Sequence, residues 1–217
     1  MKAFSVFALL FFGQICFSQN IVEFFQMIPD SVVFNLSTSE REQIATHSKN
    51  NKSFEDAYKV MNATKDNYTF ETVNKSKTYL KLIGSFEGQF QMKLWKLPKP
   101  YLLVGVYRES CGPVCVTEQL EFYRYSPKTG FEKLNLATVF PLQKMQELIT
   151  PKLQKDCAFE EEHWMDFLSY QFSEKGKSIQ VIWNNEAATS CEFALSFELY
   201  LLPDNLKNQT YFGIKEN

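Results

Sequence analysis

Two cysteines separated by three residues are the first candidates for chemistry in this chain. They enclose Gly112, Pro113 and Val114 in the run from Cys111 to Cys115. Closely spaced thiols can perform thiol–disulfide exchange, but redox-active pairs usually have two intervening residues and lie at a helix N-terminus. Here the sequence on both sides is typical of strands. We therefore expect a structural disulfide between Cys111 and Cys115, with a thiol–disulfide oxidoreductase as the alternative.

A metal site is the second possibility that these thiols raise. Cys111 and Cys115, together with Cys157 and His163, include the residue types that bind zinc. The spacing lacks the usual second cysteine pair, however, and an oxidising compartment favours disulfides over thiolate ligands. We expect no metal and no cofactor.

Other potential catalytic groups lack the spacing that catalysis requires. The acidic residues 160–162 with Asp166 match neither a calcium-binding loop nor the paired carboxylates of a glycosidase, so we expect a solvated run of charge. His47 and His163 are expected at the surface. The sequence has no GxSxG, P-loop, HExxH or glycine-rich dinucleotide motif. A noncatalytic protein is favoured over an enzyme.

Aromatic side chains offer a binding surface instead. The chain holds 21 Phe, 10 Tyr and 3 Trp, and most of these rings are expected in the core because sheets favour aromatic residues. Some rings could lie exposed on one sheet face, as a platform for a peptide, glycan or lipid. The candidates for this face are Tyr107, Tyr123, Tyr125 and Trp183.

The start of the chain predicts export. Lys2 is followed by an uncharged apolar run over residues 3–17, and Ser18 precedes polar residues, which is the pattern of a secretory signal peptide. We expect residues 1–18 to be removed, with no membrane-spanning segment left in residues 19–217. An N-terminal membrane anchor is the alternative, although the apolar run is short for a span. The expected location is the periplasm or the outward-facing cell envelope.

Charge and the remaining cysteines fit that location. The formal net charge is −2, with no long run of either sign, which argues against nucleic acid and anionic membrane surfaces as partners. Cys16 leaves with the signal peptide, and the other four of the five cysteines allow three disulfide connectivities. The expected pairs are Cys111 with Cys115 and Cys157 with Cys191.

The elements that must position these residues begin with a central hairpin. Residues 101–125 form two runs rich in β-branched and aromatic residues around Gly112 and Pro113, which predicts a β-hairpin. The first run is apolar on both faces, so we expect it at the centre of a sheet. The second run mixes polar and apolar residues, as expected for a partly solvated neighbour.

Helices precede and interrupt the predicted sheet. Apolar residues recur at helical spacing over residues 21–28, and Ser37 with Glu40 fits a capping box for a second helix that ends near His47. A third helix is expected over residues 54–61. After the hairpin, Pro141 opens a helix that Pro151 is expected to interrupt.

The remaining segments predict further strands. Period-two alternation places these strands near residues 70–72, 79–83, 90–94, 131–136, 166–172, 178–183 and 193–201. The expected fold is α+β, with N-terminal helices followed by a predominantly antiparallel β-meander and one interrupting helix. Residues 19–217 are expected to form a single domain.

Four segments, taken in order, also carry a family resemblance. They are residues 24–44, 79–98, 101–123 and 166–181, with Met27-Ile28-Pro29-Asp30 before a helix and a strand that enters Cys111-Gly112-Pro113. They resemble an uncharacterised family of exported Bacteroidales-type proteins, a domain of unknown function. The resemblance implies export and a shared fold, but no activity. Residues 191–202 depart from the family as a plain alternating strand, so the topology after Val181 stays open.

Together these observations predict an exported protein that binds or scaffolds an envelope partner. That partner would be a protein, peptide, glycan or lipid.

Overall fold

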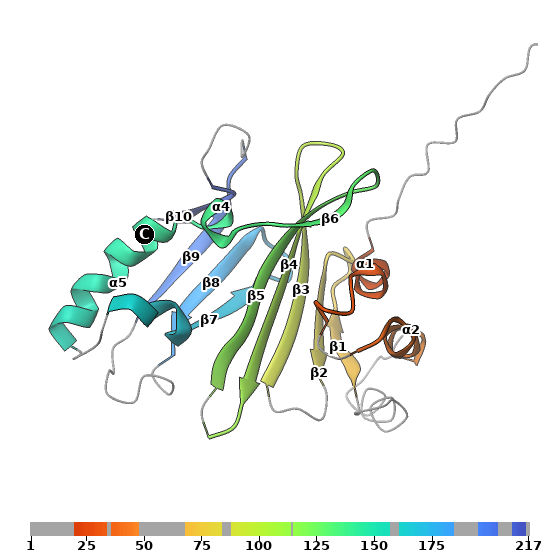
Figure 1. Cartoon of the computed structure of the whole chain (residues 1–217), viewed down its shortest axis with the longest axis horizontal. Helices are drawn as coiled ribbons and strands as arrows, with labels where there is room; N and C mark the ends of the chain where they lie inside the picture. Colours follow the sequence, from red (N-terminus) through yellow and green to blue (C-terminus); the bar gives the residue numbers. More distant parts are fainter. Residues whose placement is uncertain are drawn as a thin grey trace, which may run out of the picture.

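The computed structural model describes residues 20–33, 36–47, 68–83, 88–113, 115–156, 161–184, 195–203 and 210–215. Within them, two N-terminal helices precede a six-stranded antiparallel sheet, and a helical segment leads to a four-stranded antiparallel sheet. Figure 1 shows α1 and α2 on one side of the first sheet and the second sheet with α5 on the other. This is the predicted α+β fold.

The two N-terminal helices form as their sequence predicts. α1 (Ile21–Met27) is capped by Asn20, whose side chain accepts a hydrogen bond from the backbone of Val22. α2 (Thr38–His47) begins with a capping box, in which Ser37 N donates to Glu40 Oε2 at 2.8 Å and Glu40 N donates to Ser37 Oγ at 3.4 Å. The predicted third helix lies outside the described residues.

The first sheet is a meander in which each strand pairs with the next along the chain. Its strands are β1 (Thr69–Val73), β2 (Tyr79–Ile83), β3 (Gly88–Lys96), β4 (Leu102–Cys111), β5 (Cys115–Ser126) and β6 (Gly130–Lys133). Residues 102–109 of β4 are all buried, which confirms the expected central strand. β5 is partly or fully exposed over residues 115–121 and mostly buried over residues 122–126, as expected for a partly solvated neighbour.

Two hydrophobic cores lie on opposite faces of this sheet. Leu102, Val104 and Val106 of β4 face the helix-side core, which contains the buried apolar residues of α1 and α2. Leu103 and Tyr107 face the inter-sheet core, which the second sheet covers. Because successive side chains of a strand point to opposite faces, one apolar run supplies both cores.

The second sheet has the strand order β10-β9-β8-β7. Its strands are β7 (Leu168–Phe172), β8 (Ser178–Trp183), β9 (Ser196–Leu201) and β10 (Phe212–Lys215). β10 is absent from the sequence prediction, yet Phe212 is fully buried and packs edge to face with Trp95 at a centroid distance of 5.4 Å. β10 therefore forms the last strand of this sheet, although the sequence of its four residues alone does not predict a strand.

The segment between the sheets differs from the prediction in two places. After β6 the chain turns into α4 (Leu136–Val139), capped by Asn135, rather than continuing as a strand to residue 136. α5 (Leu142–Asp156) runs through Pro151 instead of stopping there. Pro151 and Glu147 are both exposed, so the carbonyl group that loses its helical hydrogen bond lies on the water-facing side.

A 3₁₀ helix, η3 (Glu161–Phe167), then leads into β7, so Asp166 lies in this turn and not in the predicted strand. None of the helices that the structure describes is long and apolar enough to cross a membrane.

Candidate functional site

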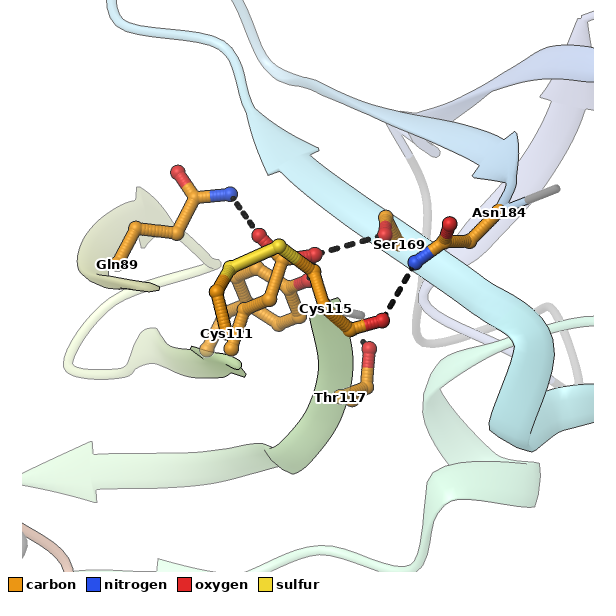
Figure 2. Close-up of a disulfide and its surroundings, with 8 residues drawn as sticks. Gln89, Cys111, Cys115, Thr117, Ser169 and Asn184 are labelled. Atoms are coloured by element: carbon orange, nitrogen blue, oxygen red, sulfur yellow. Dashed lines mark hydrogen bonds between the residues drawn. A yellow bond between two sulfur atoms is a disulfide. The ribbon is translucent and has the colours of Figure 1, made fainter. Parts of the chain in front are cut away.

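The end of the β4–β5 hairpin meets the second sheet, and a disulfide lies at this junction. Cys111 and Cys115 are cross-strand partners and are bonded to each other, as predicted. Figure 2 shows the disulfide between Gln89 of β3 on one side and Ser169 and Asn184 on the other. The predicted hairpin therefore places both sulfur atoms beside strands from a distant part of the sequence.

Glu109 is the charged residue of this junction. The residue is 8% exposed and lies on the inter-sheet face of β4. Gln89 Nε2 donates to Glu109 Oε2 at 2.8 Å, while Tyr107 Oη and Ser169 Oγ donate to Glu109 Oε1 at 3.0 and 2.8 Å. All three donors are neutral groups, and together they fix the carboxylate in one orientation.

Tyr107 keeps its hydroxyl proton well into the alkaline range. Burial is the largest cause that raises the pKa of Tyr107 to about 12, and the Thr117 hydroxyl offsets part of this effect. A tyrosine is already protonated at neutral pH, so the shift extends the range over which the phenol can donate its hydrogen bond to Glu109.

Further hydrogen bonds join the two sheets around the disulfide. Asn184 Nδ2 donates to the Cys115 carbonyl oxygen at 2.6 Å, and Thr117 Oγ1 donates to the Leu168 carbonyl oxygen at 2.6 Å. These contacts link residues that are 69 and 51 positions apart in the chain. Because they orient both sides of the junction, the site is held by tertiary contacts as well as by the disulfide.

A cleft of about 410 Å³ opens beside the disulfide. It is lined by Gln89, Glu109, Cys115, Ser169, Tyr170, Gln171, Ile182, Trp183 and Asn184. Glu109 is the one charged side chain among these lining residues. The volume of the cleft lies within the range of small-molecule sites, which combine apolar walls with a few polar groups that fix the orientation of the ligand.

The four aromatic residues proposed as an exposed platform do not form one. Tyr107 and Trp183 are buried in the inter-sheet core, and Tyr123 and Tyr125 are buried in the helix-side core. The prediction of a shared exposed face is wrong because helices cover one face of the first sheet and the second sheet covers the other. Trp183 alone of these four lines the cleft.

The zinc hypothesis also finds no support in the residues that can be placed. Glu109, Cys111 and Cys115 bring potential ligand atoms within 4.8 Å of one another, but the two sulfur atoms are bonded to each other in the disulfide. A disulfide sulfur is not the thiolate that zinc binds. Cys157, Cys191 and the side chain of His163 lie outside the described residues.

The remaining candidates do not join the cleft. His47 is exposed in the last turn of α2, and Asp166 lies in η3. Glu160 is outside the described residues, as are the side chains of Glu161 and Glu162.

The sequence contains one signal for Glu109 that motif searching overlooks. Leu103, Gly105, Tyr107 and Glu109 occupy alternate positions of β4, so Glu109 puts a carboxylate on a face that is otherwise apolar or aromatic. A charge at a buried position of an alternating strand requires hydrogen bonds or a charged partner. Gln91 and Lys93 break the apolar pattern of β3 in the same way, and both are buried.

Comparison with known proteins agrees with the resemblance found in the sequence. Residues 14–207 match the family described as "Protein of unknown function (DUF3256)". The chain belongs to the DUF3256 family. No curated protein matches this DUF3256 chain.

A solved structure shares the fold of this DUF3256 protein. It is a domain of an uncharacterised protein from Porphyromonas gingivalis, with a TM-score of 0.53 and 11% sequence identity. The alignment covers 91% of this chain and 98% of that domain. At this identity the likeness concerns the fold alone, and both comparisons lead to proteins without an assigned activity.

Proposed function

We propose that this protein is an exported, noncatalytic binding protein of the bacterial cell envelope, with the cleft beside the Cys111–Cys115 disulfide as its binding site. The observation that carries the proposal is the composition of the cleft. A carboxylate held by three neutral donors stands next to the side-chain amides of Gln89, Gln171 and Asn184 and the apolar side of Ile182. Fixed polar groups beside an apolar wall are typical of recognition sites.

Export is supported by the N-terminal sequence and by the disulfide. Disulfides persist in the periplasm and outside the cell but are rare in the reducing cytosol. The mature chain should begin at Gln19 and be found in the periplasm or on the outward-facing envelope. Intact-mass measurement of the exported protein tests this expectation. Retention of residues 1–18, or a lipid mass on Cys16, would contradict the proposed processing.

The proposal also treats residues 19–217 as one domain. Both cores use β4, which supports cooperative folding of the two sheets and the N-terminal helices. We further propose that the Met27-Ile28-Pro29-Asp30 segment and the Cys111–Cys115 turn are features of the family. Candidate partners remain an envelope protein, a peptide, a glycan or a lipid.

A thiol–disulfide oxidoreductase using Cys111 and Cys115 is the second candidate. The position of Cys115 in the wall of the cleft favours it, because an attacking thiolate needs access to the disulfide. The surroundings favour the binding protein. Glu109 lies close to both sulfurs, and a nearby negative charge raises the pKa of a thiol, whereas reactive cysteines lie at helix N-termini or beside cations.

An insulin-reduction assay separates the two functions. The wild-type protein and a Cys111→Ser variant are compared with dithiothreitol as the electron source. For a binding protein we expect the same background rate with both. Robust turnover by the wild type that disappears in Cys111→Ser would replace the binding proposal with the oxidoreductase.

A further inference from the structure

We propose that the cleft recognises a primary ammonium group on an aliphatic stem, with Glu109 as the residue that binds it. This inference rests on the proposed binding function and specifies the chemistry of the ligand. It follows from three features of the cleft: the carboxylate that has no cationic partner among the described residues, the acceptor positions that these residues leave open on it, and the shape and polarity of the walls.

The first feature is the difference between Glu109 and the other carboxylates of the first sheet. Glu118 pairs with Arg108 at 3.1 Å, Glu132 with Arg124 at 2.7 Å, and Glu121 with Lys133. Glu109 is more deeply buried than these residues, yet it makes no ion pair with any described residue. Buried charges in proteins are normally paired, so the cleft beside Glu109 is suited to a cationic ligand.

The second feature is the remaining hydrogen-bonding capacity. An ionised carboxylate has about four acceptor positions. The three donors to Glu109 occupy two positions on Oε1 and one on Oε2. The position on Oε2 that no described residue occupies suits an ammonium group, which is a compact charge whose donors can go to separate acceptors.

Other cations fit this arrangement less well. A guanidinium group binds a carboxylate best through two parallel hydrogen bonds, which need both oxygens. Oε1 of Glu109 already accepts from Tyr107 and Ser169. Calcium requires about six to eight oxygen ligands, and Glu109 supplies the only carboxylate among the residues that line the cleft.

The third feature is the wall around the carboxylate. Gln171 lines the same cleft, and its side-chain carbonyl oxygen can accept from an ammonium group. Ile182, which is 37% exposed, and the neighbouring Trp183 give the cleft an apolar side. A volume of about 410 Å³ exceeds what an ammonium group alone needs and leaves room for an alkyl stem. A free alkylamine and a lysine side chain share this chemistry.

The test is a titration of the isotope-labelled mature chain, followed by amide NMR shifts, with three probes. N-acetyl-lysine methylamide and N-acetyl-norleucine methylamide have similar stems, but the second lacks the ammonium group, and pentylamine represents a free alkylamine. We expect the lysine probe to shift resonances around Glu109, Ser169 and Asn184 and to bind about tenfold more tightly than the norleucine probe. If pentylamine binds as tightly as the lysine probe does, a free alkylamine is sufficient for recognition. Weaker binding of pentylamine would identify a lysine in a peptide.

Two variants complete the test. Glu109→Gln should reduce affinity for the lysine probe about tenfold, because it removes the charge and keeps the size of the side chain. Glu132→Gln removes an exposed carboxylate of the same sheet and should leave affinity unchanged. The comparison of probes in the wild-type chain needs no variant, so it decides the matter even if Glu109→Gln does not fold.

Several outcomes would overturn the ammonium site. Equal binding of the lysine and norleucine probes would retain the cleft as a binding site but remove the ammonium specificity. Absence of shifts with all three probes would reject the ligand class, as would unchanged affinity in Glu109→Gln. The noncatalytic function fails separately, through thiol-dependent turnover in the insulin assay.

Discussion

Gly105 of β4 lies against the indole ring of Trp95 on the neighbouring strand. A Cβ atom at Gly105 would come within 2.7 Å of Trp95 Cζ3 and within 3.0 Å of Phe122 Cε1. Trp95 in turn packs edge to face on Phe172 of the second sheet, at a centroid distance of 5.4 Å. The missing side chain at Gly105 therefore makes room for the ring that links the two sheets.

Replacing Gly105 by alanine should destabilise the protein by overpacking. We expect Gly105→Ala to lower the free energy of unfolding by about 1 to 3 kcal/mol. Urea denaturation followed by tryptophan fluorescence measures this loss. Gly112→Ala is the matched control, because a Cβ at Gly112 would meet no atom within 4 Å. Equal stability of the two variants would show that the Trp95 contact does not constrain Gly105.

Arg41 should anchor the segment between α1 and α2. Its side chain is 1% exposed, donates to the carbonyl oxygens of Leu36 and Ile28 at 2.6 and 2.7 Å, and pairs with Asp30 at 2.9 Å. Arg41→Met keeps much of the apolar stem but leaves these buried carbonyl groups without a donor. We expect a loss of about 2 to 4 kcal/mol in the free energy of unfolding, measured by chemical denaturation.

The control for Arg41 is an arginine on the surface. Arg124 pairs with Glu132 at 2.7 Å, but both side chains are exposed. Arg124→Met should therefore lower the free energy of unfolding by less than about 1 kcal/mol. If Arg41→Met is as mild as this control, the N-terminal segment does not depend on the arginine.

Lys93 should make stability depend on pH in the alkaline range. Its Nζ atom donates to the Glu174 carbonyl oxygen at 3.1 Å and lies 5.8 Å from the centre of the Tyr79 ring. Burial lowers the pKa of Lys93 to about 8, although the negative charge of Glu174 opposes this shift. An unfolded lysine has a pKa of about 10.4. Between these values the unfolded chain binds more protons, so the free energy of unfolding should rise with pH.

A Lys93→Met variant isolates this contribution. The free energy of unfolding of the wild type minus that of the variant should increase from pH 8 to pH 10 and stay flat below that range. Tyrosines of the unfolded chain ionise alike in both proteins, and burial raises the pKa of Tyr79 beyond this pH range in the folded state, so tyrosine ionisation cancels in the difference. Lys128→Met changes an exposed turn residue. The free energy of unfolding of this variant should change with pH in the same way as that of the wild type. A constant wild-type minus Lys93→Met difference across the whole range would mean that Lys93 keeps an ordinary pKa.

The pairing of Cys157 with Cys191 remains a prediction, because both lie outside the described residues. This bridge would enclose residues 158–190 and should stabilise the protein by about 3 to 4 kcal/mol in the chain-entropy model. The Cys111–Cys115 bridge closes a far smaller loop, with a sequence separation of 4. Cys191→Ser should therefore lower the melting temperature more than Cys115→Ser does. Peptide mapping without reduction tests the connectivity, and a crosslink from Cys111 to Cys157 or Cys191 would contradict it.

Local sequence was sufficient for the features that depend on neighbouring residues. The capping box at Ser37 and Glu40, the apolar alternation of β4 and the turn between Cys111 and Cys115 each involve contacts within a few residues or across one hairpin. A period of two identifies a strand and its two faces, and a turn brings adjacent strands into register. These signals predicted the antiparallel first sheet and the position of its central strand.

Only the tertiary structure decided what covers each face of that sheet. The sequence pattern predicts both Tyr107 and Tyr123 as aromatic residues of a strand. Tyr107 lies under the second sheet, whereas Tyr123 lies under the N-terminal helices. The contacts of Glu109 with Ser169 and of Cys115 with Asn184 join residues 60 and 69 positions apart. Periodicity carries no information about such distant pairs, because their contact depends on how two separately formed sheets pack against each other.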